Sequence, residues 1–442
     1  MHSMDRGYSW LVLASSFMID CIVLGQVINS GIYFVVFLDH FQSSRKDTSV
    51  PGALCYSLLS LVGPVAGGLQ KRYGARAVIM SGALVTSAGM ALSYFATDLW
   101  HLSLTYGCMC GIGYGLCVTP SLSVVPEYFE RHLFFATSFI AIGGALGGWI
   151  FAPLSLFLIE TYTWRGSMLI QAGFCLQLFI FGAICKSRVL HRGVAMHSLF
   201  DLALLKDCRF ILLLLDGVVL GGATSTVFSM IKSLIISRGL TMWQSAELVS
   251  IGSASNTLAK VAVAFVSQLQ CTDIALLYSI ATFAGAAGIA ACVFSYDYWS
   301  FASAMVIFGL CQAVKFSQPP NVIIDLFGVD KAVTGLGYFM FSVGLGGFGF
   351  PFLSGWIADQ TDLQYAFLIT AINCVMGFAF CCLLLRKTEL LTNLTGPSAG
   401  DKNAINEISH DEAVLEIKDA RKAPEVDEIR EKEKLEGAFQ FD

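Results

Sequence analysis

Hydrophobic residues along the chain are grouped into blocks of about twenty, and short polar segments between the blocks carry most of the charged residues. A helix of about 20 apolar residues crosses the roughly 30 Å hydrocarbon core of a bilayer. The pattern therefore predicts an all-α membrane protein with twelve transmembrane helices. Their expected centres lie near Leu24, Leu61, Leu84, Ile112, Ile142, Phe174, Gly221, Ala254, Phe283, Val306, Leu345 and Val375.

The longest internal polar segment separates the sixth block from the seventh. This spacing predicts a six-helix half over residues 1–185, a cytoplasmic linker over 186–209 and a second six-helix half over 210–385. Residues 386–442 mix Lys, Glu and Asp with few aromatics, which is typical of a disordered segment. Acidic residues outnumber basic ones in this tail, and the net charge of −5 resides there.

Composition narrows the class of protein. The 442 residues are 55% hydrophobic and 13% charged, whereas a soluble domain is roughly 45–50% apolar and about 25% charged. No basic patch suggests a nucleic-acid partner. The 14 cysteines lie mainly in apolar runs and form no metal-binding spacing. HExxH and GxxxxGK[ST] are absent from the sequence, so we expect neither an enzyme, a bound cofactor nor a nucleotide-driven pump.

Loop charges predict the orientation. Cytoplasmic loops carry an excess of Lys and Arg, and placing both termini in the cytoplasm puts most of these residues inside. Arg72, Arg76 and Arg131 are then cytoplasmic, and few basic residues such as Arg45 and Arg238 face outward.

Ionisable residues also occur within the predicted spans. A charge at the centre of a membrane helix costs about 2.5–3.5 kcal/mol on insertion scales, and such residues usually face a partner or a solute pathway. Lys232 lies near the outer end of its span, where it is expected to extend toward the membrane surface. The charged residues within spans are Asp20, Asp216, Lys232, Lys260 and Lys315.

Asn256 and Lys260 are four residues apart, so both lie on one face of the eighth helix. This arrangement makes them candidates to bind an anion, with a structural lysine neutralised by a membrane-buried acid as the alternative. Lys315 has two open roles, as a second cation for the solute or as the ion-pair partner of Asp216. Asp20 and Asp216 are the candidates for proton coupling or for pairing with these lysines.

Several motifs in the expected order resemble those of the monocarboxylate transporters, a solute carrier family of the major facilitator superfamily. The stretch "DRGYSW" resembles the start of the family's first span, and "YFERHLFFATSFIAIGGALG" resembles its entry into the fifth. "GPVAGGLQKRYGARAV" is similar to the loop between spans two and three, and "DLFG" has a counterpart after span ten. The motif and gating candidates are Asp5, Gly7, Trp10, Arg72, Arg76, Tyr128, Phe129, Arg131 and Asp325.

The resemblance implies the major facilitator fold, in which two six-helix halves surround a central cavity. It also implies that Lys260 receives a substrate carboxylate, where transporting members typically have an arginine. Asn256 stands where those members have an acid, so proton coupling through this pair is not expected. The family's lysine in span one is absent, and Ile28 and Asn29 occupy that region, which leaves Asn29 as a polar candidate for the solute site.

Three functions remain open from the sequence. The first is a plasma-membrane carrier that moves a small organic anion by alternating access, with or without a proton. The second is a facilitative carrier of aromatic amino acids, thyroid hormone-like, creatine-like or carnitine-like solutes, and the third is a membrane sensor or scaffold that does not transport. The expected partners are the solute, protons and membrane lipid, with a single-span immunoglobulin-like chaperone implied for some relatives.

Overall fold

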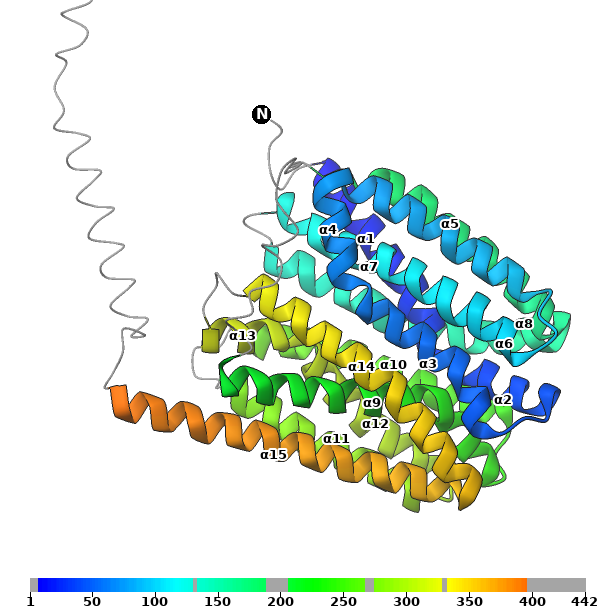
Figure 1. The fold of residues 1–442 in the computed structure, drawn as a ribbon. Helices are drawn as coiled ribbons and strands as arrows, with labels where there is room; N and C mark the ends of the chain where they lie inside the picture. The colour runs from blue at the N-terminus through cyan, green and yellow to red at the C-terminus, as the bar shows by residue number, and fades with distance from the viewer. Residues whose placement is uncertain (1–6, 130–132, 188–205, 267–273, 328–331, 396–442) are drawn as a thin grey trace, which may run out of the picture. The chain divides into compact units, whose positions relative to one another are not determined.

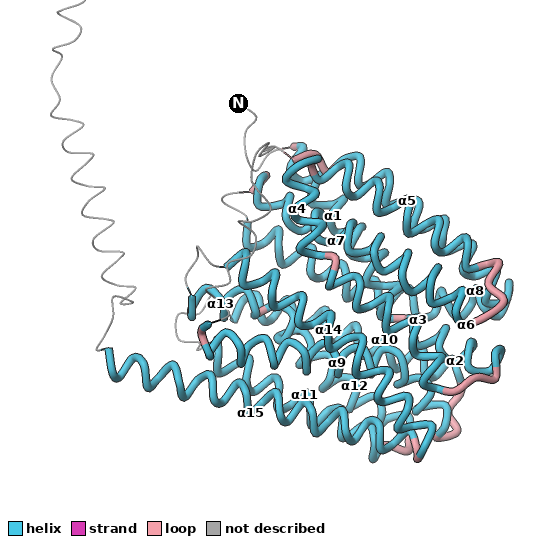
Figure 2. Tube along the Cα trace, viewed as in Figure 1, coloured by secondary structure: helices cyan, strands magenta, loops and turns pink. Residues whose placement is uncertain are grey.

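The computed structural model describes residues 7–129, 133–187, 206–266, 274–327 and 332–395. Every regular element in these segments is helical, as Figure 2 shows. Residues 188–205 of the predicted linker (186–209) and residues 396–442 of the predicted tail (386–442) lie outside the described residues. The helices are α1 (Tyr8–Ile28), α2 (Ser30–Phe41), α3 (Arg45–Leu61), α4 (Gly63–Tyr73), α5 (Ala75–Ser93), α6 (Leu99–Leu102), the π-helix η1 (Ser103–Met109), α7 (Cys110–Val124), the 3-10 helix η2 (Val125–Glu127), α8 (Leu133–Ile184), α9 (Cys208–Ser237), α10 (Met242–Val266), α11 (Ile274–Phe294), α12 (Tyr298–Ser317), α13 (Pro319–Phe327), α14 (Ala332–Gln360) and α15 (Leu363–Thr395).

Membrane-length helices dominate the described segments. Nine helical segments there are long and apolar enough to cross a bilayer, and the pair α3 and α4, bent by 42°, makes ten. Helix α8 is a 52-residue element interrupted at Thr163, whose φ of 64° and ψ of 170° are not helical. Dividing α8 at Thr163 and adding the more polar α10 gives twelve segments, the number expected from the sequence. Twelve transmembrane helices stay a prediction for the chain as a whole.

Helix α15 differs from the expected boundary. The sequence predicted disorder from residue 386, but α15 continues to Thr395. No glycine or proline interrupts residues 386–395, and Gly396 and Pro397 are the first helix-breaking residues after the span. The helix therefore continues beyond the membrane-length segment.

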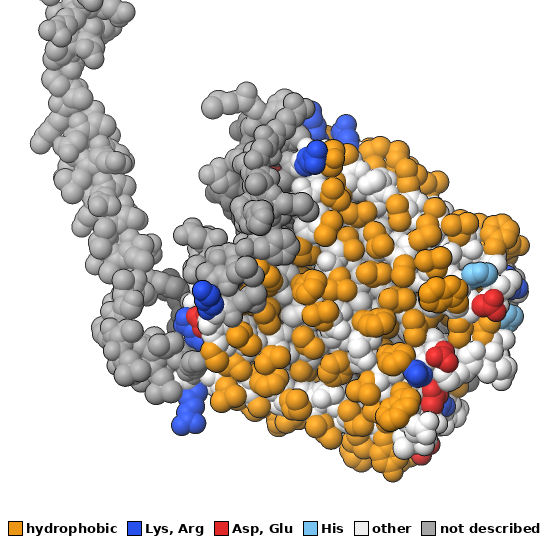
Figure 3. Space-filling view, viewed as in Figure 1, with side chains coloured by type: hydrophobic (Ala, Val, Ile, Leu, Met, Phe, Trp, Pro, Cys, Tyr) orange, Lys and Arg blue, Asp and Glu red, His pale blue; other side chains and the backbone are white. Residues whose placement is uncertain are grey.

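The face of the molecule drawn in Figure 3 has an apolar belt between two charged ends. Exposed basic residues gather at the end that carries the start of α1, and exposed acidic residues gather at the opposite end. We call these the inner and outer ends, following the predicted orientation. The basic residues include Arg72, Arg76, Lys186 and Lys206, and the acidic ones include Asp98, Glu160, Asp297, Asp359 and Asp362.

Buried side chains form two large clusters that follow the two halves of the sequence. One lies mainly among α1, α5, α7 and α8. The other lies mainly among α9, α10, α11, α12 and α15. Helices α3 and α14 pack against each other across the boundary between the halves, where they lie side by side in Figure 1.

Glycines allow the closest helix contacts. A Cβ atom on Gly346 of α14 would lie 1.8 Å from the Val218 carbonyl oxygen of α9, and one on Gly221 of α9 would lie 1.9 Å from the Val343 oxygen. The neighbouring atoms are backbone, so only separation of the helices could relieve the clash. Small residues permit this approach in membrane helix pairs.

The outer end of α3 is capped by a residue from the other half of the chain. The carboxylate of Asp359, in the last turn of α14, accepts hydrogen bonds from the backbone N–H groups of Arg45 and Lys46 at 2.8 and 2.9 Å. Ser44 accepts the next one, from the Asp47 N–H, at 3.1 Å. Three of the unpaired donors at the start of α3 are thereby satisfied, and the negative charge lies at the positive end of the helix.

We predict that Gly346→Ala separates α9 from α14 and lowers stability by about 1–3 kcal/mol, the usual range for overpacking. Gly349 is the matched control on the same helix, because a Cβ there would meet no atom within 4 Å. Thermal unfolding of the purified variants in detergent measures the difference. Equal melting temperatures for the two variants would contradict the tight seam.

We also predict that Asp359→Ala loosens the contact between α3 and α14 at the outer end. The buried Ser49, whose hydroxyl lies 3.4 Å from the Pro351 carbonyl oxygen, serves as a reporter when replaced by cysteine. Asp359→Ala should raise the rate at which a thiol reagent labels Ser49→Cys by several-fold, since an N-cap contributes about 1 kcal/mol. Asp362→Ala, at an exposed acid beside it, is the control and should leave the rate unchanged.

Candidate functional site

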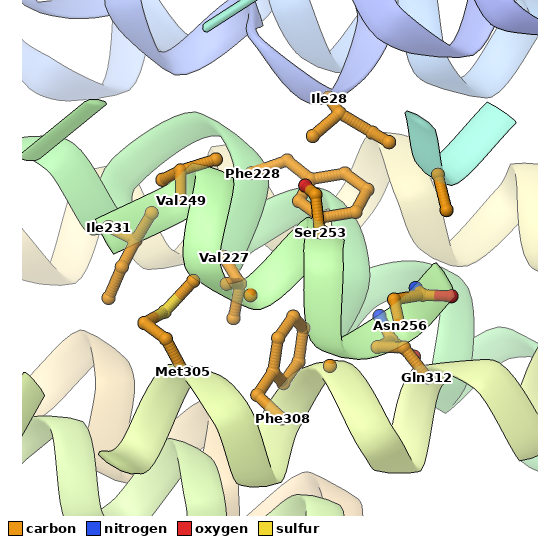
Figure 4. Close-up of a pocket in the computed structure, with 13 residues that line it drawn as sticks. Ile28, Val227, Phe228, Ile231, Val249, Ser253, Asn256, Met305, Phe308 and Gln312 are labelled. Carbon is orange, nitrogen blue, oxygen red and sulfur yellow. The ribbon is translucent and has the colours of Figure 1, made fainter. Parts of the chain in front are cut away.

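A pocket lies between the two halves, bounded by the end of α1, by α9, α10 and α12, and by Ala145 of α8. Its empty volume is about 450 Å³, including space open to the surroundings, and it is lined mostly by apolar side chains. Figure 4 shows Ile28 at one wall and Met305 and Phe308 at the opposite wall, with Val227 and Phe228 of α9 between them. Such a lining accommodates an apolar body and leaves few polar groups to orient it.

Asn256 is the polar lining residue with unused hydrogen-bonding capacity. Its Oδ1 is buried without a partner among the described residues. Gln312, which also lines the pocket, donates its Nε2 hydrogen to Oγ1 of Thr224 at 2.8 Å. A buried amide oxygen without a donor is unfavourable, so Asn256 is suited to bind a donor that enters the pocket.

Lys260 lies one turn from Asn256 but does not line the pocket. It is partly buried, and its Nζ donates to the Ala141 carbonyl oxygen of α8 at 2.9 Å. No carboxylate of the described residues lies within the 4.0 Å of an ion pair with it. The ammonium is therefore held by a neutral acceptor of the opposite half.

Asp20 of α1 is an acidic residue that interacts electrostatically with Lys260. The side chain is buried, its Oδ1 has no hydrogen-bond partner among the described residues, and its charge interacts with that of Lys260. The predicted candidates Asp20, Lys260 and Asn256 thus occupy one region, where α1, α8 and α10 meet.

Asp216 and Lys315 form a separate polar cluster within the second half. Lys315 Nζ contacts the two carboxylate oxygens of Asp216 at 3.0 and 2.8 Å and also donates to Thr282 at 2.8 Å. Tyr278 donates its hydroxyl to Asp216 at 2.6 Å, and its ring lies 3.8 Å from the Lys315 ammonium. Of the two roles considered for Lys315, the structure shows the ion pair.

This cluster borders a second pocket of about 360 Å³. Phe308 and Gln312 line both pockets and therefore lie between the ion pair and the first pocket. Asn256 lines the first pocket and the charged cluster borders the second, so the two groups do not share one cavity.

The position of Lys232 contradicts the expectation that its side chain extends to the membrane surface. It is completely buried, with 0% of its surface exposed, and its Nζ donates to Oδ1 of Asn29 at 3.2 Å. The sequence position near the end of the span suggested an exposed side chain. The prediction was wrong because α2 packs against this face of α9, with Gly31 directly against the Phe228 carbonyl group.

The motif residues at the inner end lie together around the start of α1. Tyr8 and Tyr128 rings pack 5.9 Å apart, and Trp10 and Phe129 rings pack edge to face at 5.5 Å. The Tyr128 hydroxyl donates to the Lys186 carbonyl oxygen at 2.5 Å, so these residues join α1, η2 and the end of α8.

The other motif candidates show no direct part in the site. Gly7, just before α1, has a φ of 43°, which explains glycine there. Arg72 and Arg76 are exposed and form no ion pair with a described residue, although the Arg72 guanidinium lies 5.3 Å from the Tyr73 ring centre. Asp5 and Arg131 lie outside the described residues, and Asp325 lies on α13 with a side chain that is not described.

Sequence reasoning missed Tyr278, Thr282, Phe308 and Gln312. Gln312 precedes Lys315 by three residues on an otherwise apolar helix, and that spacing was a usable signal. Phe308 carried none, because the chain contains 34 phenylalanines and most of them serve packing.

Comparison with known proteins agrees with this architecture. Residues 16–269 and 272–426 match the Major Facilitator Superfamily. A crystal structure of the nucleoside transporter NupG superposes with a TM-score of 0.70 at 16% identity, covering 86% of this chain and 100% of NupG. At this identity the likeness concerns the fold.

Curated relatives narrow the position within the superfamily. Mouse (Mus musculus) monocarboxylate transporter 11 is 26% identical over 386 residues, covering 84% of this chain and 86% of the mouse protein. Bovine (Bos taurus) monocarboxylate transporter 13 is 27% identical, covering 83% and 87%. These relatives are transporters rather than enzymes. The chain belongs to the major facilitator superfamily, as a multi-pass membrane transporter and a divergent member of the monocarboxylate transporter group.

Proposed function

We propose that this transporter moves a small organic anion of the monocarboxylate type across the plasma membrane by alternating access. The observation that carries the proposal is the position of Lys260, whose ammonium is held by the main-chain oxygen of Ala141 and not by a carboxylate. An entering carboxylate can replace this neutral acceptor. Lysine binds a carboxylate as a point charge, without the two parallel hydrogen bonds of arginine.

Asn256 orients the solute in this proposal. Its unpartnered oxygen lies on the pocket wall, one turn from Lys260 on α10. A solute that carries a hydroxyl or amino group beside its carboxylate satisfies both side chains at once. The halves 1–185 and 210–385 then move as units around the pocket, which is supported by their largely separate cores.

Asp20 is the preferred candidate for proton coupling. Asp216 already accepts hydrogen bonds from Lys315 and Tyr278, which favours a structural role. Asp20 keeps a buried oxygen without a donor next to Lys260. A proton on Asp20 would neutralise the carboxylate and leave the Lys260 charge to the solute.

A second candidate function follows from the apolar lining. Val227, Phe228, Met305 and Phe308 surround most of the pocket, and an aromatic amino acid or another solute with a large apolar body would bury its surface there. Facilitated transport of aromatic amino acids, or of thyroid hormone-like, creatine-like or carnitine-like solutes, does not require an acidic residue that takes up and releases a proton. A sensor that does not transport is less well supported, because charged groups are retained in the interior.

The remaining parts of the proposal concern placement and partners. Basic residues gather at the inner end of the bundle (Figure 3), which supports termini in the cytoplasm. Membrane lipid surrounds the apolar belt, and a single-span immunoglobulin-like chaperone is the proposed accessory protein for delivery to the plasma membrane.

Substitution of Lys260 tests the substrate class. In proteoliposomes, uptake of labelled lactate, pyruvate, 3-hydroxybutyrate, phenylalanine, creatine and carnitine identifies the solute, with and without an inward proton gradient. For an acid that wild type carries, Lys260→Ala should reduce uptake about tenfold or more, equivalent to 1.4 kcal/mol or more, and Lys260→Arg should retain part of it. Full activity of the alanine variant would rule out Lys260 as the carboxylate site.

Substitutions of the two buried acidic residues distinguish a role in proton coupling from a role in stability. Asp20→Asn should remove the stimulation of uptake by an inward proton gradient and preserve exchange of solute across the membrane. Asp216→Asn should instead lower thermal stability by about 3–5 kcal/mol, because it leaves the buried Lys315 charge without its partner. If Asp216→Asn were stable and lost only the gradient response, the coupling role would move to Asp216.

A further inference from the structure

Lys232 is a buried lysine with no acidic partner among the described residues. It has no exposed surface, and its hydrogen-bond partner among the described residues is the neutral Oδ1 of Asn29 at 3.2 Å. No described carboxylate lies within ion-pair distance of it. An ammonium group has three donors, and a buried charge normally needs an opposite charge or several hydrogen bonds.

The other two interior lysines provide the comparison. Lys315 has a carboxylate and a hydroxyl in contact, and Lys260 interacts with the charge of Asp20. Lys232 has no equivalent acid in the part of the chain that the structure describes. The polar neighbours that precede it on its face of α9, at helical spacing, are Ser225 and Ser229, and the Ser229 hydroxyl donates to carbonyl groups of its own helix.

Asn29 is fixed in the orientation that meets Lys232. Its Nδ2 donates to the Gly25 and Gly148 carbonyl oxygens at 2.8 and 3.1 Å, so Oδ1 is directed to the ammonium. Asn29 lies at the interruption between α1 and α2, and interrupted helices in transporters often border the solute site. The contact joins the first half of the chain to the second.

The contact lies directly beside the central pocket. Ile28 and Ile231, the chain neighbours of Asn29 and Lys232, both line that pocket, as does Phe228 one turn earlier on α9 (Figure 4). Lys232 lies on the side of the pocket nearer the outer end. Separation of the halves at this end would break the contact with Asn29 and uncover the ammonium next to the pocket.

We propose that Lys232 is a second carboxylate-binding residue, used when the outer side is open, and that Asn29 takes the place of the carboxylate when it closes. The solute meets Lys232 first and Lys260, nearer the inner end, afterwards. This inference rests on the proposed function, because it requires an anionic solute. It assigns to Lys232 a binding role and not a role in stability.

Competition from the outer side tests the proposal. Phenylacetate and phenylacetamide have nearly the same shape and differ in charge, so they are added outside proteoliposomes that take up the best labelled acid of the panel. Wild type should be inhibited by the acid at least about tenfold more strongly than by the amide. In Lys232→Met this preference should fall several-fold, because only Lys260 remains to bind a carboxylate. Lys232→Arg should retain the preference, and Lys186→Met, at an exposed lysine, is the control.

The substitution Asn29→Asp tests the proposal while Lys232 itself is kept. A resident carboxylate beside Lys232 should compete with the solute, so uptake and the preference for phenylacetate should fall although the folded protein becomes more stable. A purely structural contact would gain stability without any change in inhibition.

The possible failures are distinguishable. Absence of acid uptake by wild type would overturn the proposed function and this inference together. Acid uptake by wild type, with the preference for phenylacetate unchanged in both Lys232→Met and Asn29→Asp, would overturn the role of Lys232 alone.

Discussion

The high free energy of a charge or an unpaired polar group inside the bilayer determines the rest of this structure. Backbone groups meet the constraint through helices, which satisfy their own hydrogen bonds. Side chains meet it in different ways. Asp216 and Lys315 neutralise each other and are surrounded by hydroxyl groups, whereas Lys232 and Lys260 are held by neutral oxygens. The first arrangement is a closed ion pair, and the second leaves two lysines at the boundary between the halves without a carboxylate in contact among the described residues.

The two arrangements suit different tasks. A closed ion pair within one half contributes the same interaction in every conformation that preserves that half. Contacts that join the halves, such as Lys232 with Asn29 and Lys260 with Ala141, change whenever the halves move relative to each other. A ligand shifts a conformational equilibrium only through such differences in interaction, so the neutral, replaceable contacts are where a solute can act.

Hydrophobic patterning was sufficient for the fold class, because block length and loop charge reflect the thickness and polarity of the bilayer directly. It was insufficient for Lys232, since the distance of a residue from a helix end does not reveal which neighbouring helix covers it. The Asn256 and Lys260 pair was visible from spacing alone, but the direction of the Lys260 side chain depends on α8, more than a hundred residues away. Tyr278 joins the ion pair from α11, and no local pattern connects α11 with α9.

The cap on α3 has a consequence for the balance between conformations. Asp359 belongs to one half and the first turn of α3 to the other, so the secondary structure of one half is completed only when the outer ends meet. Opening exchanges these hydrogen bonds for water and removes a charge from the helix dipole, a difference of about 1–2 kcal/mol. That amount corresponds to a roughly five- to thirtyfold change in the population of two states. Ionic strength at the outer face would therefore shift the balance between the open and closed conformations. Salt screens an exposed charge at a helix end more than it affects the buried lysines.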